Sequence, residues 1–171
     1  GNLVAGSKFH PVEAILEAYR AGHRVFGESR PQEFAAKVPA LPSDIKWHFI
    51  GHLQTNKLKM VLPYVSMVQS VDSLRLLEAI DRWGAANGRV IPVLLELHLG
   101  AEETKQGFHE EEILDILFDV AGSGGRKYPN VRIFPILAKV PVFTFSNSIL
   151  LILNTVMLLL LLLVVECSVM N

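Results

Sequence analysis

Short apolar runs alternate with longer amphipathic stretches along the first three quarters of the chain. The short runs are rich in β-branched and aromatic residues and end at Gly, Pro or polar residues, which is typical of strands. The longer stretches repeat apolar residues every three or four positions, which predicts helices. The expected strands cover 3–7, 24–28, 46–51, 65–71, 89–100 and 130–136, and the expected helices cover 11–23, 31–37, 53–63, 72–88 and 109–122. This alternation predicts a parallel α/β fold.

Two of the expected helices carry signals at their first residues. Pro11 stands where the first helical position of 11–23 is expected, and Asp72 or Ser73 can cap the helix over 72–88. The spacing predicts that the second of these helices buries a face made of Leu74, Leu77, Ile80 and Ala85.

The pattern changes after residue 132. From 133 to 171 only Lys139 and Glu166 are charged, and 149–165 is nearly all apolar. We therefore divide the chain into a region over 1–132 and an atypical hydrophobic tail over 133–171. A frame-shifted or aberrant reading is the favoured interpretation of the tail. The alternatives are a membrane anchor, for which 149–165 reaches only the lower length limit, and substitute elements that complete the fold.

Composition narrows the classes of partner. The 171 residues carry a net charge of −1, which gives no electrostatic case for a nucleic-acid partner. Cys167 is the single cysteine, so no disulfide can form within the chain, and a cytoplasmic location is expected. The first residues, Gly1 and Asn2, lack both an initiator Met and a signal-peptide pattern, which indicates a cut N-terminus.

Polar residues follow the expected strands at their carboxyl ends, where parallel α/β folds gather their chemistry. They are Lys8, Glu28 with Ser29, Gly51 with His52, Ser70 with Asp72, and His98. Because these ends share one edge of a parallel sheet, we expect the side chains to form a common rim.

Lys8 allows two interpretations. It is either a solvated strand-end charge, which spacing alone favours, or a reactive amine, which would need burial or a nearby cation to be neutral. Glu28 can hold a helix N-terminus or a loop amide rather than act as an acid. His48 and His52 are four residues apart, but Gly51 separates them onto different elements, so no metal site is expected.

Several blocks, taken in order, carry a family resemblance. They include "LVAGSK" (3–8), "FGESRPQE" (26–33), "WHFIGHLQTNK" (47–57) and "GAEETKQGF" (100–108). Together, over 3–132, they resemble the pyridoxal 5′-phosphate (PLP) homeostasis protein family, which looks like the N-terminal barrel domain of alanine racemase standing alone. The resemblance implies a (β/α)8 TIM-type barrel with PLP at its mouth, here incomplete, with about six of the eight strands recognisable.

The resemblance also implies roles for particular residues. Lys8 would form an aldimine with PLP, and Ser29 stands where the family usually has Asn near the cofactor. His48 and Asn56 fall in the family signature and are expected in the pocket wall. The late turns that hold the phosphate in the family have no recognisable counterpart in 133–171.

The function implied is the binding and supply of PLP inside the cell, without strong catalysis, with PLP-dependent apo-enzymes as recipients. Two alternatives stay open at this point. One is a weak PLP-dependent amino-acid racemase, and the other is a truncated fragment that does not build a functional site.

Overall fold

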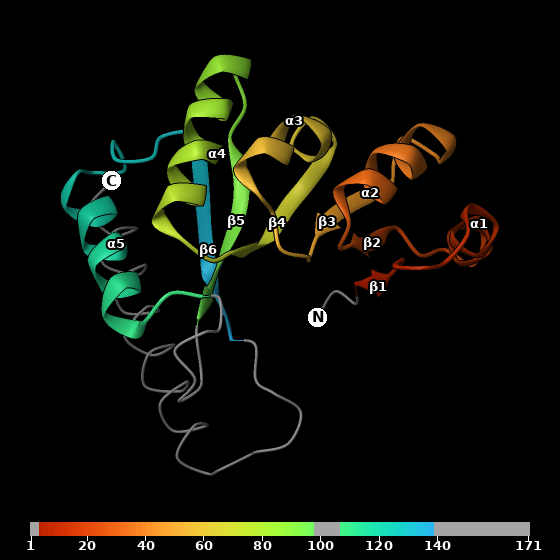
Figure 1. Ribbon diagram of the computed structural model, residues 1–171, viewed down its shortest axis with the longest axis horizontal. Coiled ribbons are helices and arrows are strands. Elements are labelled where there is room, and N and C mark those ends of the chain that lie inside the picture. Colours follow the sequence, from red (N-terminus) through yellow and green to blue (C-terminus); the bar gives the residue numbers. More distant parts are fainter. Residues whose placement is uncertain (1–3, 98–106, 139–171) are drawn as a thin grey trace, which may run out of the picture.

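A single curved sheet of parallel strands organises the protein (Figure 1). The computed structural model describes residues 4–97 and 107–138. Within these ranges the sheet has the order β1-β2-β3-β4-β5-β6, so that each strand pairs with the next one along the chain. The strands are β1 Ala5–Gly6, β2 Val25–Glu28, β3 Lys46–Phe49, β4 Val65–Val71, β5 Ile91–Leu97 and β6 Val131–Ala138. This order is that of a (β/α)8 barrel, with β1 and β6 as the two edges of the described sheet.

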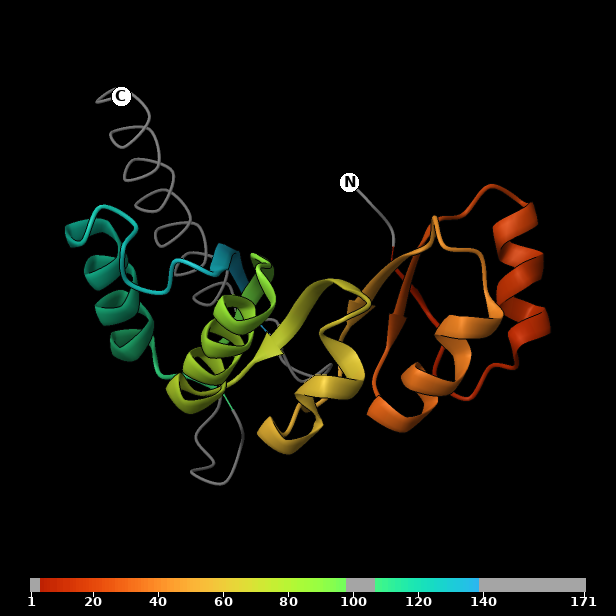
Figure 2. The ribbon, with the colours of Figure 1, turned by 90° about the horizontal axis from the view of Figure 1, so that it is seen from above.

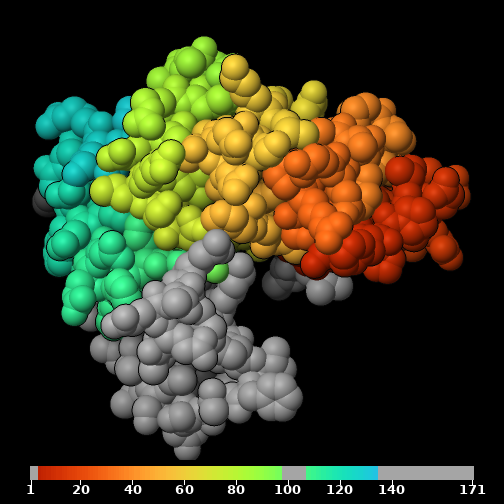
Figure 3. Space-filling model, viewed as in Figure 1, coloured from red at the N-terminus to blue at the C-terminus, as the bar shows by residue number. Residues whose placement is uncertain are grey.

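The helices of the described residues lie along one side of the sheet (Figure 2). They are α1 Val12–Arg20, α2 Pro31–Lys37, α3 Leu58–Val61, α4 Leu74–Asn87 and α5 Glu110–Gly122, with short 3-10 helices η1 Val38–Ala40 and η2 Thr55–Lys57. Successive strand–helix units stand side by side in chain order (Figure 3). The predicted alternation of strands and helices is therefore confirmed.

Strand alternation separates a helix-facing side of the sheet from an inner side. On β3, Trp47 and Phe49 face the helices, because the ring of Phe34 on α2 packs edge-on against both, at centroid distances of 5.6 and 6.2 Å. His48 lies between them and faces inward, in register with Gly27 on one side and Met67 on the other. The main core fills the space between the sheet and the helices.

Helix α4 buries a different face from the one predicted. Leu77 and Ile80 are fully buried as expected, but Leu74 is 44% exposed and Ala85 is also exposed. The buried set is Leu76, Leu77, Ile80 and Gly84. At Gly84 a Cβ would lie 2.5 Å from the carbonyl oxygen of Arg89, so the missing side chain lets α4 meet the following loop closely and fixes its rotation.

Other differences concern element ends. Pro11 is the N-cap of α1 rather than its first helical residue. The helix expected over 53–63 begins only at Thr55 as a 3-10 turn, because Gln54 is still extended at ψ 144°, and the α-helical part is Leu58–Val61. Strand β6 continues from Val131 to Ala138 and so crosses the division drawn after residue 132.

The apolar segment 149–165 lies outside the described residues. In the part of the chain that the structure describes, no helix is both long and apolar enough to cross a membrane. The interpretations of the tail, and the division into 1–132 and 133–171, stay predictions.

Candidate functional site

Lys8 lies two residues after the end of β1, at the carboxyl rim of the sheet. The side chain is exposed, and its Nζ sits 4.9 Å from the ring centre of Phe9. Phe9 has a left-handed backbone at φ 63°, and the guanidinium of Arg30 lies 4.4 Å from the same ring. Left-handed residues other than Gly often mark functional turns. The described residues do not bury the amine, so they do not provide the desolvation considered for a reactive lysine.

Ser7, the residue before Lys8, is 1% exposed and firmly held. Its backbone N–H donates to the carbonyl of Gly27 at 2.7 Å, which extends the β1–β2 ladder by one step. Its Oγ lies 3.0 Å from both the Gly27 carbonyl oxygen and Oε2 of Glu28, so one hydroxyl hydrogen is shared between two acceptors. The attachment point of the Lys8 chain is thus fixed although the Lys8 amine is exposed.

Glu28 is fully buried and collects hydrogen bonds from several elements. Its Oε1 accepts from the backbone N–H of Ser29 at 2.8 Å, and Oε2 accepts from Nζ of Lys37 at 2.6 Å. The prediction that Glu28 holds a loop amide is confirmed. A buried carboxylate needs such partners, because removing it from water without them is costly.

Ser29 directly follows β2 and has an unsatisfied hydroxyl. Its Oγ is buried and has no hydrogen-bond partner among the described residues. Buried polar atoms nearly always have a hydrogen-bond partner, so this hydroxyl is a candidate for a hydrogen bond to a group outside the described residues. Gly51, at the end of β3, packs directly against the Ser29 backbone, where a Cβ would approach within 2.0 Å of the Ser29 oxygen.

His48 faces the inner side of the sheet and pairs with Gln69 of β4. The Gln69 Nε2 lies 2.7 Å from the His48 Nδ1. An amide nitrogen can only donate, so Nδ1 accepts and the ring proton is on Nε2. Burial lowers the pKa of His48 below its ordinary value of 6.5, which favours the same neutral form.

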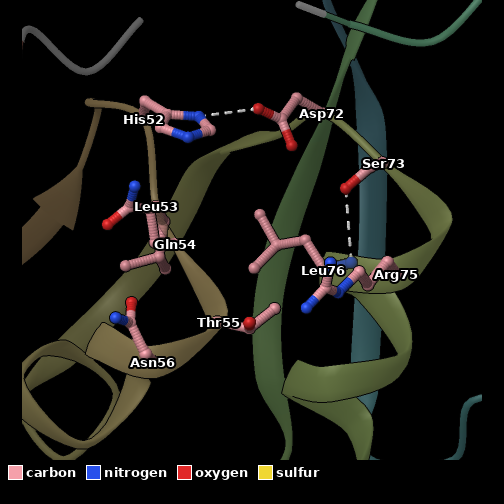
Figure 4. A pocket seen from close by; sticks show the side chains of 9 residues that line it. All are labelled: His52, Leu53, Gln54, Thr55, Asn56, Asp72, Ser73, Arg75 and Leu76. Carbon is pink, nitrogen blue, oxygen red and sulfur yellow. Dashed lines mark hydrogen bonds and ion pairs between the residues drawn. The ribbon is translucent and has the colours of Figure 1, made fainter.

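Asn56 lies apart from these residues, in a pocket of about 420 Å³ between the loop after β3 and the start of α4. Figure 4 shows His52 pointing toward Asp72 at the top of this pocket, with Asn56 lower on the same loop and Arg75 across from it. The Nδ1 of His52 lies 2.9 Å from Oδ2 of Asp72. The structure therefore groups Asn56 with His52 and Asp72.

The structure thus distributes the predicted site residues over neighbouring elements. Lys8 and Ser29 follow the adjacent strands β1 and β2, and His48 is on β3, whereas His98 lies outside the described residues. In 4–97 and 107–138, no three His, Cys, Asp or Glu side chains gather in a way that could hold a metal ion. Sequence reasoning missed Lys37 and Gln69. Strand alternation could have placed Gln69 beside His48, but nothing local links Lys37 to β1.

An ordered parallel sheet with helices on its outer side and polar side chains at its carboxyl rim defines the class of α/β barrel proteins. The sequence pattern of the "Alanine racemase, N-terminal domain" family matches residues 5–134. The chain belongs to this family, as the resemblance predicted.

Proteins named pyridoxal phosphate homeostasis protein are similar to this chain. One from Aquifex aeolicus is 39% identical over 140 residues, which cover 81% of this chain and 59% of that protein. One from Schizosaccharomyces pombe is 37% identical over 116 residues, covering 67% of this chain and 49% of that protein. The chain therefore spans only about half to three fifths of these relatives.

A solved structure has the same fold. PipY of Synechococcus elongatus, solved with PLP bound, superposes with a TM-score of 0.73 at 32% identity, over 85% of this chain and 66% of that one. The predicted alanine racemase N-terminal fold is thereby confirmed.

Proposed function

We propose that this protein binds PLP and that the amine of Lys8 holds it covalently. The observation that carries the proposal is that two groups without hydrogen-bond partners follow adjacent strands. These are the Lys8 amine, with no hydrogen bond or ion pair in the described part of the chain, and the orphaned, buried Oγ of Ser29. The PLP-bound relative with the same fold supports it.

PLP supplies an aldehyde and an electron-withdrawing ring. The Lys8 amine would hold the cofactor covalently at this aldehyde. Ser29 would donate its unused hydroxyl hydrogen to an acceptor atom of the cofactor. His48, held neutral with its proton on Nε2, would present a fixed hydrogen-bond donor from the pocket wall. Asn56 would line the cofactor site from the pocket that it shares with His52 and Asp72.

The Lys8 amine and the unpaired Ser29 hydroxyl support binding of the aldehyde end of PLP. The phosphate turns that the family has after strands seven and eight have no recognisable counterpart in 133–171. The proposal for this chain is therefore that the covalent bond and the rim contacts hold the cofactor.

An absorbance titration tests the proposal. Addition of PLP to the full chain should produce an imine band, and borohydride reduction followed by peptide mapping should place the label on Lys8. Lys8→Ala should remove the band. Lys46→Ala is the matched control, because Lys46 is an exposed lysine at the start of β3, at the edge of the sheet opposite to the rim. This variant should keep the band. A wild-type chain without a band would refute the proposal.

We further propose that the biological role is PLP homeostasis in the cytoplasm, with transfer of the cofactor to PLP-dependent apo-enzymes. The similarity to proteins bearing the homeostasis name supports this role. The loaded chain should reactivate an apo-enzyme faster than its own PLP is released into buffer. It should show no α-proton exchange on a panel of amino acids, whereas exchange at enzymatic rates would favour the racemase alternative.

A further inference from the structure

A second lysine approaches the backbone that carries Lys8. Lys37, the last residue of α2, has a side chain that is only 12% exposed. Its Nζ donates to the carbonyl oxygen of Ser7 at 2.9 Å. This hydrogen bond joins the end of α2 to the residue that follows β1.

The Lys37 ammonium is fully used by three acceptors. Besides the Ser7 carbonyl, Nζ donates to Oε2 of Glu28 at 2.6 Å and to Oε2 of Glu33 at 3.0 Å. An ammonium has three N–H donors, so each donor has one partner and none is left for a ligand. Such charge-assisted hydrogen bonds are stronger than neutral ones.

Glu28 links the same cation to both strand ends of the rim. Its Oε2 accepts from Ser7 Oγ at 3.0 Å, and its Oε1 accepts from the backbone of Ser29 at 2.8 Å. Glu28 and Lys37 therefore hold the residue before Lys8 and the backbone of Ser29 in one buried cluster. We call Glu28, Glu33 and Lys37 the Lys37 cluster.

We propose that Lys37 is a positioning residue: the Lys37 cluster fixes the Ser7–Lys8 peptide at the rim, and it keeps the Lys37 amine itself out of reaction with an aldehyde. The inference rests on the proposed function, because it concerns how Lys8 meets PLP.

Protonation supports the second half of the proposal. Burial alone would lower the pKa of Lys37, but its hydrogen bonds to Glu28 and Glu33 outweigh burial and raise the pKa above the ordinary value of 10.5. A lysine attacks an aldehyde only through the lone pair of its neutral amine. Of two lysines close to the same rim, Lys37 stays an ammonium with its donors occupied, whereas Lys8 has no such partners in the described residues.

The test compares PLP affinity in folded variants of the full chain. Glu28→Gln with Lys37→Met removes both charges of the pair together, so that neither is left buried alone. The PLP titration should then show an affinity lower by about tenfold or more, because Lys8 is no longer held in the geometry that favours its bond to the aldehyde. The matched control is Glu78→Gln with Arg82→Met, which removes an exposed ion pair of α4 and should leave the affinity unchanged.

Two further measurements keep the inference testable. Borohydride reduction of the wild-type chain with PLP should label Lys8 and leave the Lys37 peptide unlabelled. If the double variant does not fold, Lys37→Arg replaces it: the planar guanidinium keeps the charge but cannot match all three acceptors, so affinity should fall several-fold.

The outcomes separate this inference from the proposed function. A wild-type band, with equal affinity in the folded double variant or in Lys37→Arg, would overturn the positioning role and leave PLP binding standing. Label on Lys37 in the wild-type chain would overturn the claim that its amine is kept out of reaction. Lack of any wild-type band would overturn the proposed function, and this inference with it.

Discussion

A Cβ atom on Gly51 would lie 2.0 Å from the backbone oxygen of Ser29. The two strand ends can meet this closely only because Gly51 has no side chain. The contact is also held from both sides: Ile50 N–H donates to the Glu28 carbonyl at 2.9 Å, and Ser70 Oγ donates to the Gly51 carbonyl at 2.5 Å. The glycine therefore sets the position of Ser29 at the rim, and the buried Ser70 supports that position rather than facing a ligand.

The first prediction concerns Gly51→Ala. The added methyl group must displace the Ser29 backbone, because a flexible side chain is not what it meets. We expect a loss of about 1–3 kcal/mol in the free energy of unfolding, the usual range for overpacking. The affinity for PLP should also fall, because the substitution moves Ser29.

The control is Gly122→Ala at the end of α5, where no atom lies within 4 Å of the added Cβ. Urea unfolding of both variants provides the measurement. The steric explanation would be wrong if the two substitutions changed stability equally.

The second prediction follows from the neutral state of His48. Its pKa is lowered by burial in the folded chain, so the unfolded chain binds the proton more readily. Stability is therefore full above the unfolded pKa of about 6.5 and declines as the pH falls through the lower, folded pKa. Urea midpoints of wild type and His48→Gln at about pH 7.5 and about pH 5.5 test this. The variant should lose less stability on acidification, and an equal loss in both would contradict the prediction.

Local signals in the sequence were enough to predict most of the helices and strands. Helix 31–37 was predicted with its observed bounds, and in the structure Pro31 lies in its first turn. Strand 65–71 also agrees, since a β-rich apolar run stands between Pro63 and a helix cap. Such signals act within a few residues, so the sequence displays them directly.

Features set by contacts between distant segments could not be predicted in this way. The rotation of α4 depends on how Gly84 meets the loop at Arg89, and spacing alone favoured a face that includes Leu74. The unpaired hydroxyl of Ser29 is likewise visible only when the neighbours of that atom are known. At the candidate site, the sequence indicated the strand ends, but the reach of Lys37 to Ser7 required the fold.

The third prediction concerns the cap of α4. Sequence allowed Asp72 or Ser73, and the structure shows Ser73 Oγ accepting from the backbone N–H of Leu76 at 3.3 Å, whereas Asp72 pairs with His52. Ser73→Ala should therefore cost about 1 kcal/mol, the typical value of an N-cap. Asp72→Asn keeps the helix start and should cost less, because its partner His52 is 45% exposed. Thermal unfolding of the two variants provides the comparison. A larger loss of stability in Asp72→Asn than in Ser73→Ala would show that Ser73 is not the cap.

The last prediction concerns the stability of the buried pair Glu28–Lys37. Lys37→Met alone leaves the fully buried Glu28 carboxylate without its cation, which should cost about 3–5 kcal/mol in the free energy of unfolding. Glu28→Gln together with Lys37→Met removes both charges and should be clearly more stable than Lys37→Met alone. The single variant Glu28→Gln completes the double-mutant cycle, and urea unfolding gives the free energy of unfolding of each variant. Additive losses from the two single substitutions would show that the charges do not act as a pair. A stable double variant that still binds PLP weakly would separate the positioning of Lys8 from the stability of the fold.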